Sequence, residues 1–234
     1  LLMQGAAGAA GGGLYVDDIF STFLYTGNNT ARSINTGVDM TEGGLVWIKS
    51  RSNARANTLF DTERGAGHYL LSDHNFASQN NYAGTLTSFN SNGFSLGADP
   101  NSDNVNRNNY TQASWSFRKA PGFFDVVTWT GNGVQGREIP HNLGSVPGFI
   151  VVKRTDGAED WTVYHRSPGA TKHGELNNNF QFVSDNKWDS TEPTSSVFTV
   201  GNHERVNYNG WTYVAYVFAG GSSTAATARS VSFD

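Results

Sequence analysis

The sequence contains no cysteine, few charged residues and no long apolar run. Without cysteine, disulfide bonds and thiolate metal sites cannot contribute, which suits a protein that folds in a cytosol. Asp, Glu, Lys and Arg make up 15% of the 234 residues, the net charge is −4, and no basic run occurs. Because phosphate binding needs clustered Lys and Arg, no nucleic-acid partner is expected. No segment approaches the roughly 20 apolar residues of a membrane span, so no membrane insertion is expected.

Aromatic residues and glycine are abundant instead. Aromatics reach 13% of the chain and glycine occurs 27 times, together with many Asn, Ser and Thr residues. Short stretches of alternating polar and apolar residues separate these polar clusters, which is typical of strands joined by turns. The composition therefore favours an all-β protein with polar loops over a helical enzyme.

The sequence repeats itself. Residues 45–49 (LVWIK) correspond to 149–153 (FIVVK), 57–60 (NTLF) to 161–164 (WTVY), and 93–97 (GFSLG) to 197–201 (VFTVG), and each pair is 104 residues apart. Phe117 and its counterpart Phe218 are 101 residues apart, so one loop of the second copy is three residues shorter. This spacing predicts two units of about 100 residues, each large enough for a modest core.

Four segments are expected along the chain: a Gly/Ala-rich lead-in or docking arm (1–16), a first unit (17–120), a second unit (121–219), and a linker with the start of a following domain (220–234). Short strands separated by Gly, Asn and Pro turns are buried either by two packed antiparallel sheets or by a barrel. We predict the first, an all-β fold of two tandem, jelly-roll-like antiparallel β-sandwiches. The short joint at 120–122 is expected to hold them side by side.

Alternation predicts which side chains face the cores. The opening strands share a face formed by Ile19/Phe123, Phe23/Val127 and Tyr25/Trp129. In the closing strands, the residues expected to point inward are Ala113, Trp115, Phe117, Val214, Tyr216 and Phe218. The stretch 45–49 is apolar on both sides, as in a central strand, and Lys49 and Lys153, which end the two copies of that strand, are expected to reach solvent.

Ligand contacts are expected in the middles of the units, 67–87 and 171–195, where the two copies are least alike. Divergent loops on a repeated scaffold commonly carry recognition. Tyr82 and Trp188 lie there and are the candidate contacts, as platforms on which a sugar could stack. The alternative is that large aromatics fill the cores, as expected for Trp161 and Trp211.

A calcium site at Asp99 and Asp103 is a weak candidate, because oxygen-bearing residues alternate in this segment. The segment departs from an EF-hand loop, since Asn104 stands in place of the glycine and Tyr110 in place of the bidentate glutamate. A solvated turn rich in Asn and Asp also explains it. The prediction is therefore no metal and no cofactor.

No catalytic residue is predicted. Two carboxylate pairs, Asp61 with Glu63 and Glu159 with Asp160, could suggest glycoside cleavage, but only the fold sets the distance that such chemistry needs. Such pairs on a β-protein surface are usually solvated, so the protein is expected not to be an enzyme.

Residues 139–144 (IPHNLG), 147–154 (PGFIVVKR) and 161–165 (WTVYH) resemble a module of tailed-bacteriophage virion proteins that recurs in tail-fibre-like proteins of marine and cyanobacterial phages. The first unit keeps 47–49 (WIK) and the bridge 115–123 (WSFRKAPGF), but it lacks the PHNLG string. The resemblance covers about 17–219. Segment 223–234 resembles the junction at which such proteins enter a laminin-G/concanavalin-like domain.

The resemblance implies a structural protein of the virion, made in the host cytoplasm, without established catalytic residues. It implies a tail fibre or appendage that contributes to host attachment, as a homo-oligomer with a trimer favoured. Its partners would be other virion proteins and a host-surface glycan or receptor. Two alternatives stay open: a capsid-decorating or neck protein bound to other virion proteins, and a polysaccharide-cleaving fibre.

Overall fold

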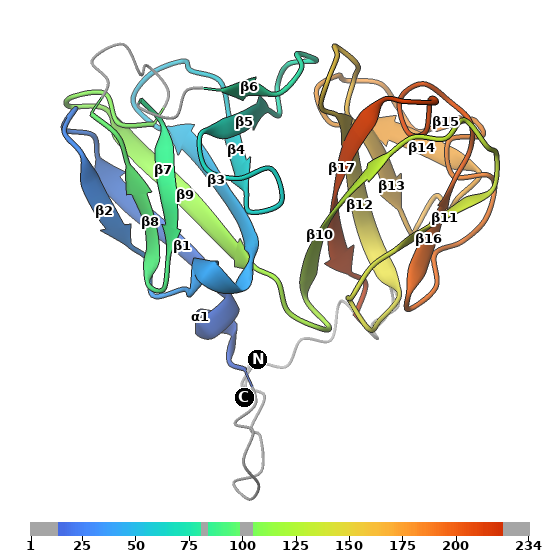
Figure 1. Cartoon of the computed structure of the whole chain (residues 1–234), viewed down its shortest axis with the longest axis horizontal. Helices are drawn as coiled ribbons and strands as arrows, with labels where there is room; N and C mark the ends of the chain where they lie inside the picture. Colours follow the sequence, from blue (N-terminus) through green and yellow to red (C-terminus); the bar gives the residue numbers. More distant parts are fainter. Residues whose placement is uncertain (1–13, 81–83, 99–104, 222–234) are drawn as a thin grey trace, which may run out of the picture.

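A computed structural model describes residues 14–80, 84–98 and 105–221. We call 14–120 the first unit and 121–221 the second unit (Figure 1). The first unit contains the short helix α1 (Val16–Ile19), the 3-10 turn η1 (Met40–Glu42) and strands β1 (Phe20–Thr26), β2 (Arg32–Asn35), β3 (Gly44–Ser50), β4 (Thr58–Asp61), β5 (His68–Leu71), β6 (Gln79–Asn80), β7 (Leu86–Asn90), β8 (Gly93–Leu96) and β9 (Thr111–Arg118). The second unit contains β10 (Phe124–Thr130), β11 (Arg137–Pro140), β12 (Pro147–Arg154), β13 (Thr162–His165), β14 (Lys172–Glu175), β15 (Val183–Ser184), β16 (Val197–Val200) and β17 (Thr212–Ala219).

Each unit pairs a large sheet with a small one. The large sheets have six strands each, in the orders β1-β9-β3-β4-β5-β6 and β10-β17-β12-β13-β14-β15. The small sheets are β2-β8-β7 and β11-β16. All pairings are antiparallel, so the predicted all-β sandwich fold is confirmed. The same strand order therefore occurs in both large sheets.

Equivalent buried hydrogen bonds accompany this repeated order. The hydroxyl of Tyr25 donates to the carbonyl of Val105 (2.7 Å), and the indole of Trp129 donates to the carbonyl of Val206 (3.0 Å). Tyr25 and Trp129 are 104 residues apart and the two acceptors are 101 apart, the offsets found in the sequence. Both large side chains lie in the core of their own unit and tie β1 or β10 to the loop before the last strand.

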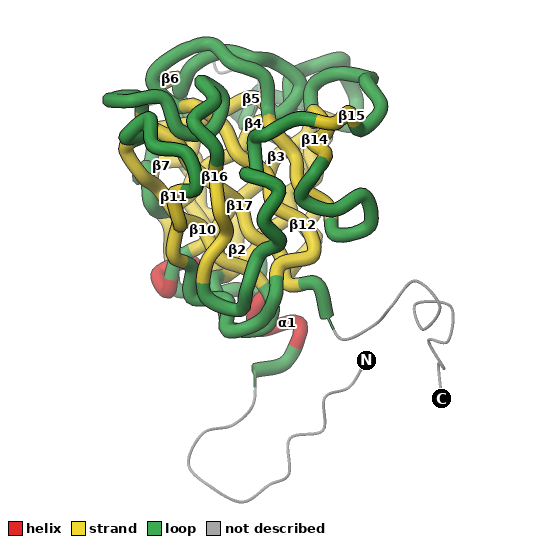
Figure 2. The backbone as a smooth tube through the Cα atoms, turned by 90° about the vertical axis from the view of Figure 1, so that its right-hand side faces the viewer, coloured by secondary structure: helices red, strands yellow, loops and turns green. Residues whose placement is uncertain are grey.

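Three apolar clusters separate the sheets. One lies between the sheets of the first unit and includes Ile34, Val46, Phe60 and Phe94. Another fills the second unit and includes Ile150, Trp188, Phe198 and Val217. The third draws residues from both units, so the two large sheets face each other and the small sheets lie outside. Figure 2 views this stack from the side of the second unit, with β11 and β16 in front.

Strand β3 is a central strand, as predicted; its outer face is buried and its inner face is buried in part. Val46 and Ile48 point into the first unit's own core, whereas Leu45 and Trp47 point to the layer between the units. The strand has neighbours on both sides, β9 and β4. Its apolar character on both faces therefore comes from one sandwich core and one contact between units.

The expected orientation of the closing strands was wrong. Tyr216 and Phe218 lie in the layer between the units, and Tyr213, Ala215 and Val217 fill the second unit's own core. In β9, Ser114 and Ser116 are fully buried opposite Ile48 and Val46, so these serines face the first unit's core. Because both faces of these strands are buried, hydrophobic alternation could not tell one core from the other.

The turn glycines after β1 and β10 are required for close approach of backbones. A Cβ on Gly27 would lie 2.1 Å from the carbonyl oxygen of Arg107, and a Cβ on Gly131 would lie 2.1 Å from that of Tyr208. A methyl group cannot fit at that distance, so these two positions accept glycine alone. The backbone of the next residue but one, Asn29, has a positive φ of 55°.

A buried polar group crosses the layer between the units. Asp61, at the end of β4, accepts hydrogen bonds from Arg64 Nε (2.6 Å) and from the hydroxyl of Tyr216 on β17 (2.7 Å). Arg64 also donates to the Tyr216 hydroxyl (3.2 Å). Burial lowers the pKa of Arg64, but the Asp61 carboxylate outweighs it and holds that pKa above its ordinary value. Burial raises the pKa of Tyr216 well above the usual range.

Replacing Asp61 tests this contact. Asp61→Asn leaves the Arg64 guanidinium, whose side chain is 7% exposed, without a charged partner. Breaking a buried pair costs about 3–5 kcal/mol, so we expect that loss in the free energy of unfolding measured by urea titration. The matched control is Glu63→Gln, which weakens the partly exposed Glu63–Lys119 pair (2.8 Å) and is expected to cost about 0–1 kcal/mol. Equal losses in the two variants would contradict the role given to Asp61.

Candidate functional site

A recess of about 300 Å³ opens on the inner face of the first unit's large sheet. It is lined by Trp47 on β3, Trp115 and Phe117 on β9, and Asn57 just before β4. Trp47 and Trp115 are directly paired across the strands, and their rings lie 6.3 Å apart at 71°. Both indoles are partly exposed. The recess therefore presents two differently oriented aromatic surfaces and one carboxamide to solvent.

The second unit closes the equivalent place. Trp161 stands at the position of Asn57, 104 residues later, and is fully buried. Its indole donates to the carbonyls of Leu71 (2.9 Å) and His74 (3.1 Å) in the first unit. The indole fills the space that Asn57 leaves open, and the first unit covers it. The recess thus exists in one copy of the scaffold and is filled in the other.

The indole nitrogen of Trp47 is buried and has no hydrogen-bond partner among the described residues. A buried donor without a partner costs free energy, about 1–3 kcal/mol. Asn57 is held in place by its backbone, whose N–H donates to Asp73 Oδ1 (3.0 Å) and whose carbonyl accepts from Ser72 N (3.0 Å). Asn57 therefore brings the polar atoms to a recess whose walls are otherwise apolar.

A second, more polar groove runs between the units along the edge strand β10. One part, of about 550 Å³, is lined by Glu63 and Lys119 of the first unit and by residues of β10 and β11. The adjoining part, of about 400 Å³, shares Thr128 and Thr130 with the first part and adds Arg64, Thr155, Thr212 and Tyr213. Lys119 contacts Glu63 (2.8 Å) and Asp125 (3.3 Å), so these charges pair with one another.

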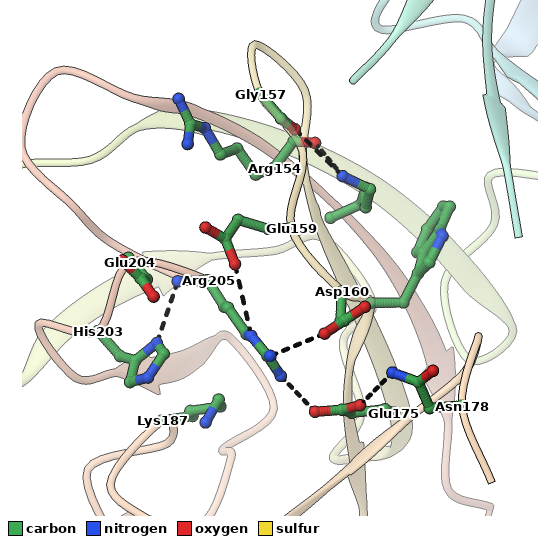
Figure 3. A network of polar contacts seen from close by, with 12 residues as sticks. Arg154, Gly157, Glu159, Asp160, Glu175, Asn178, Lys187, His203, Glu204 and Arg205 are labelled. Atoms are coloured by element: carbon green, nitrogen blue, oxygen red, sulfur yellow. Dashed lines mark hydrogen bonds and ion pairs between the residues drawn. The ribbon is translucent and has the colours of Figure 1, made fainter. Parts of the chain in front are cut away.

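Arg205 gathers three carboxylates of the second unit (Figure 3). Its guanidinium contacts Asp160 (2.7 Å), Glu159 (3.5 Å) and Glu175. Burial raises the pKa of Glu159, the nearby Glu204 raises it further, and Arg205 opposes them. The carboxylate pair noted in the sequence thus shares one guanidinium, which ties the loop before β13 to the loop before β17. Asp61 and Glu63, the other pair, have separate partners, Arg64 and Lys119.

Lys153 is fully buried, contrary to the prediction that it reaches solvent. Its ammonium donates to the carbonyls of Arg154 (2.8 Å) and Gly157 (3.4 Å). The side chain extends from the face of β12 that the first unit covers, as its cross-strand partner Val214 does. Burial lowers its pKa to about 8, although the carboxylate of Glu159 acts in the opposite direction. Lys49, its counterpart, is half-buried and donates to the carbonyl of Arg55.

The residues singled out in the sequence do not form a site in the described structure. Tyr82, Asp99 and Asp103 lie outside the described residues. Trp188 is 1% exposed and packs edge-on against Tyr164 and Phe198, so it is a core residue and not a sugar platform. Trp161 is buried as expected, and Trp211 packs against the second unit's core. Within 14–80, 84–98 and 105–221, no group of three or more His, Asp or Glu side chains could hold a metal.

Sequence reasoning missed Trp47, Trp115 and Asn57. The available signal was the repeat itself, because the small Asn57 stands where the second copy has the large Trp161. Interpreting this difference required knowing that this face of the first unit stays partly open.

In the described part of the chain, no helix is long and apolar enough to cross a membrane.

The chain belongs to a family described as a domain of unknown function (DUF7483), whose model matches residues 16–226. The match spans both units. Comparison with curated proteins and with solved structures gives no match.

The depressed pKa of Lys153 makes stability depend on pH. In the unfolded chain the lysine keeps its proton up to its ordinary pKa of 10.5, whereas in the folded chain it loses the proton near pH 8. Between these values the unfolded state binds more protons, so the folded state gains stability as pH rises. We expect Lys153→Met to be more stable than wild type at pH 7, and this difference to shrink between pH 8 and 10. A difference in melting temperature that stays constant with pH would contradict the assignment.

Trp188→Ala is expected to destabilise the second unit strongly. Removing a buried tryptophan leaves a cavity and costs about 3–5 kcal/mol, measured as the free energy of unfolding. Phe180→Ala serves as control, since Phe180 is 66% exposed and surface substitutions usually change stability by about 0.5 kcal/mol or less. A melting temperature unchanged by Trp188→Ala would show that this indole lies outside the core.

Proposed function

We propose that this chain is a non-enzymatic structural protein of a tailed-bacteriophage particle, a tail-fibre or appendage module that contributes to attachment to the host surface. The resemblance of 139–144, 147–154 and 161–165 to such modules supports this proposal. In the proposal the chain is made in the host cytoplasm, becomes part of the virion as a homo-oligomer, and binds other virion proteins.

The observation that carries the proposal is the apolar layer between the two units. It joins the two sandwiches across both large sheets, and Trp161 and Tyr216 of the second unit form hydrogen bonds with residues of the first unit. A pair of sandwiches fixed in this way transmits force and holds its loops in constant positions. Those are the properties required of a projecting part that binds weakly at each copy and gains strength from many copies.

A second function, a capsid-decorating or neck protein, is favoured by a different observation. In the described sheets, β1 and β10 are edge strands with a paired neighbour on one side. An edge strand can accept a strand from another protein. The polar groove beside β10, with Glu63 and Lys119 on its far wall, would orient such a strand.

Immuno-electron microscopy of purified particles tests where the chain lies. Antibodies against the recombinant chain are expected to label fibres or appendages projecting from the tail. Label confined to the capsid surface or the neck would replace the first function with the second. Both functions would be overturned if mass spectrometry detected none of the chain in purified particles.

A further inference from the structure

We propose that the recess formed by Trp47, Asn57, Trp115 and Phe117 binds one neutral sugar ring, a hexopyranoside. This proposal rests on the attachment function above in one respect, because it names the ligand class that the attachment would use. Four features of the molecule support it: the size of the recess, its aromatic walls, its polar atoms and its filled counterpart in the second unit.

The size of the recess selects a single ring. Its volume of about 300 Å³ is at the lower end of small-molecule pockets, which span about 300–1,000 Å³. A stable protein partner would need to bury roughly 1,200–2,000 Å² in total, far more than four side chains offer. A ligand of one ring with short substituents matches the space.

The aromatic walls require a ligand with an apolar face. Trp47 and Trp115 present rings 71° apart, so one lies against the face of a ring-shaped ligand and the other against its side. Aromatic side chains combine a large apolar surface with a polar tip. A pyranose has the matching chemistry, because its C–H groups form an apolar face and its hydroxyls form a polar rim.

The polar atoms of the recess require hydrogen-bonding groups on the same ligand. The carboxamide of Asn57 both donates and accepts. A hydrocarbon ligand forms no hydrogen bond with that carboxamide, whereas a sugar hydroxyl does. Since none of the four lining side chains carries a charge, a charged sugar would be desolvated there without a counter-charge.

The second unit shows how the same place behaves when it is closed. There Trp161 fills the position of Asn57, and its N–H is paired with two carbonyls. In the first unit the recess borders the exposed side of the sheet, where Thr22 on edge strand β1 lies directly across from Trp115. Further sugar units of a glycan would extend over Thr22 towards solvent.

The test titrates the whole chain with methyl glycosides of glucose, galactose, mannose and N-acetylglucosamine, followed by tryptophan fluorescence and by saturation-transfer NMR. We expect at least one to bind with a Kd of about 1 mM, the value that ordinary ligand efficiency gives for about 13 non-hydrogen atoms. Asn57→Trp, which fills the recess as the second unit does, should weaken binding at least about tenfold. Trp115→Ala should do the same by removing one ring.

Trp47→Phe replaces the indole with a smaller aromatic ring, so it should weaken binding about threefold to tenfold. Phe180→Ala, which removes an exposed aromatic of the other unit, should leave binding unchanged. Thermal melting of each variant shows whether it is folded. If Trp115→Ala fails to fold, Asn57→Trp and Trp47→Phe still test whether the recess binds the sugar.

Unchanged sugar binding in Asn57→Trp would overturn the proposal. So would a wild-type chain that binds none of the glycosides but binds free indole, since that would assign the recess to an apolar side chain of a protein partner. Either failure is distinguishable from failure of the attachment function. If a fluorescently labelled Asn57→Trp chain still adheres to host cells, the attachment function is retained and does not depend on the recess.

Discussion

The apolar layer between the two large sheets is the contact on which the rest of the structure depends. It buries Leu45 and Leu59 of the first unit against Val151 and Tyr216 of the second, and the Asp61–Arg64–Tyr216 group fixes their alignment. A polar group of this kind contributes little net stability, because desolvation offsets the attraction, but it penalises any other alignment that would leave a charge unpaired. The layer converts two sandwiches into one stack of four sheets.

This contact also makes the two copies unequal. The second unit's inner face is covered, so Lys153 is buried and Trp161 is capped by carbonyls of its neighbour. The first unit's inner face is covered in part, and Trp47 and Trp115 stay accessible beside Asn57. Equivalent positions of one scaffold thus became core in one copy and surface in the other. A duplicated fold can acquire a binding recess in this way without any new element.

The first unit's own core shows the complementary change. Where β17 supplies Tyr213, Ala215 and Val217, β9 supplies Gln112, Ser114 and Ser116, all buried. Of these, the Ser114 hydroxyl donates to the carbonyl of Phe23 (3.4 Å), whereas the amide of Gln112 and the hydroxyl of Ser116 have no partner among the described residues. Buried polar atoms without partners are costly, so β9 contributes less to the stability of its core than β17 does.

The sequence by itself determined the all-β class, the repeated order of strands, the central place of β3 and the faces of Tyr25 and Trp129, because each depends on spacing and local alternation. It did not determine the orientation of Tyr216 and Phe218, the burial of Lys153 and Trp188, or the open recess at Asn57. Those depend on which surface of one unit lies against the other. In a strand that is apolar on both faces, the sequence does not indicate which face makes that contact. Only the tertiary structure decided them, because covering a face removes its side chains from water whatever their position in the chain.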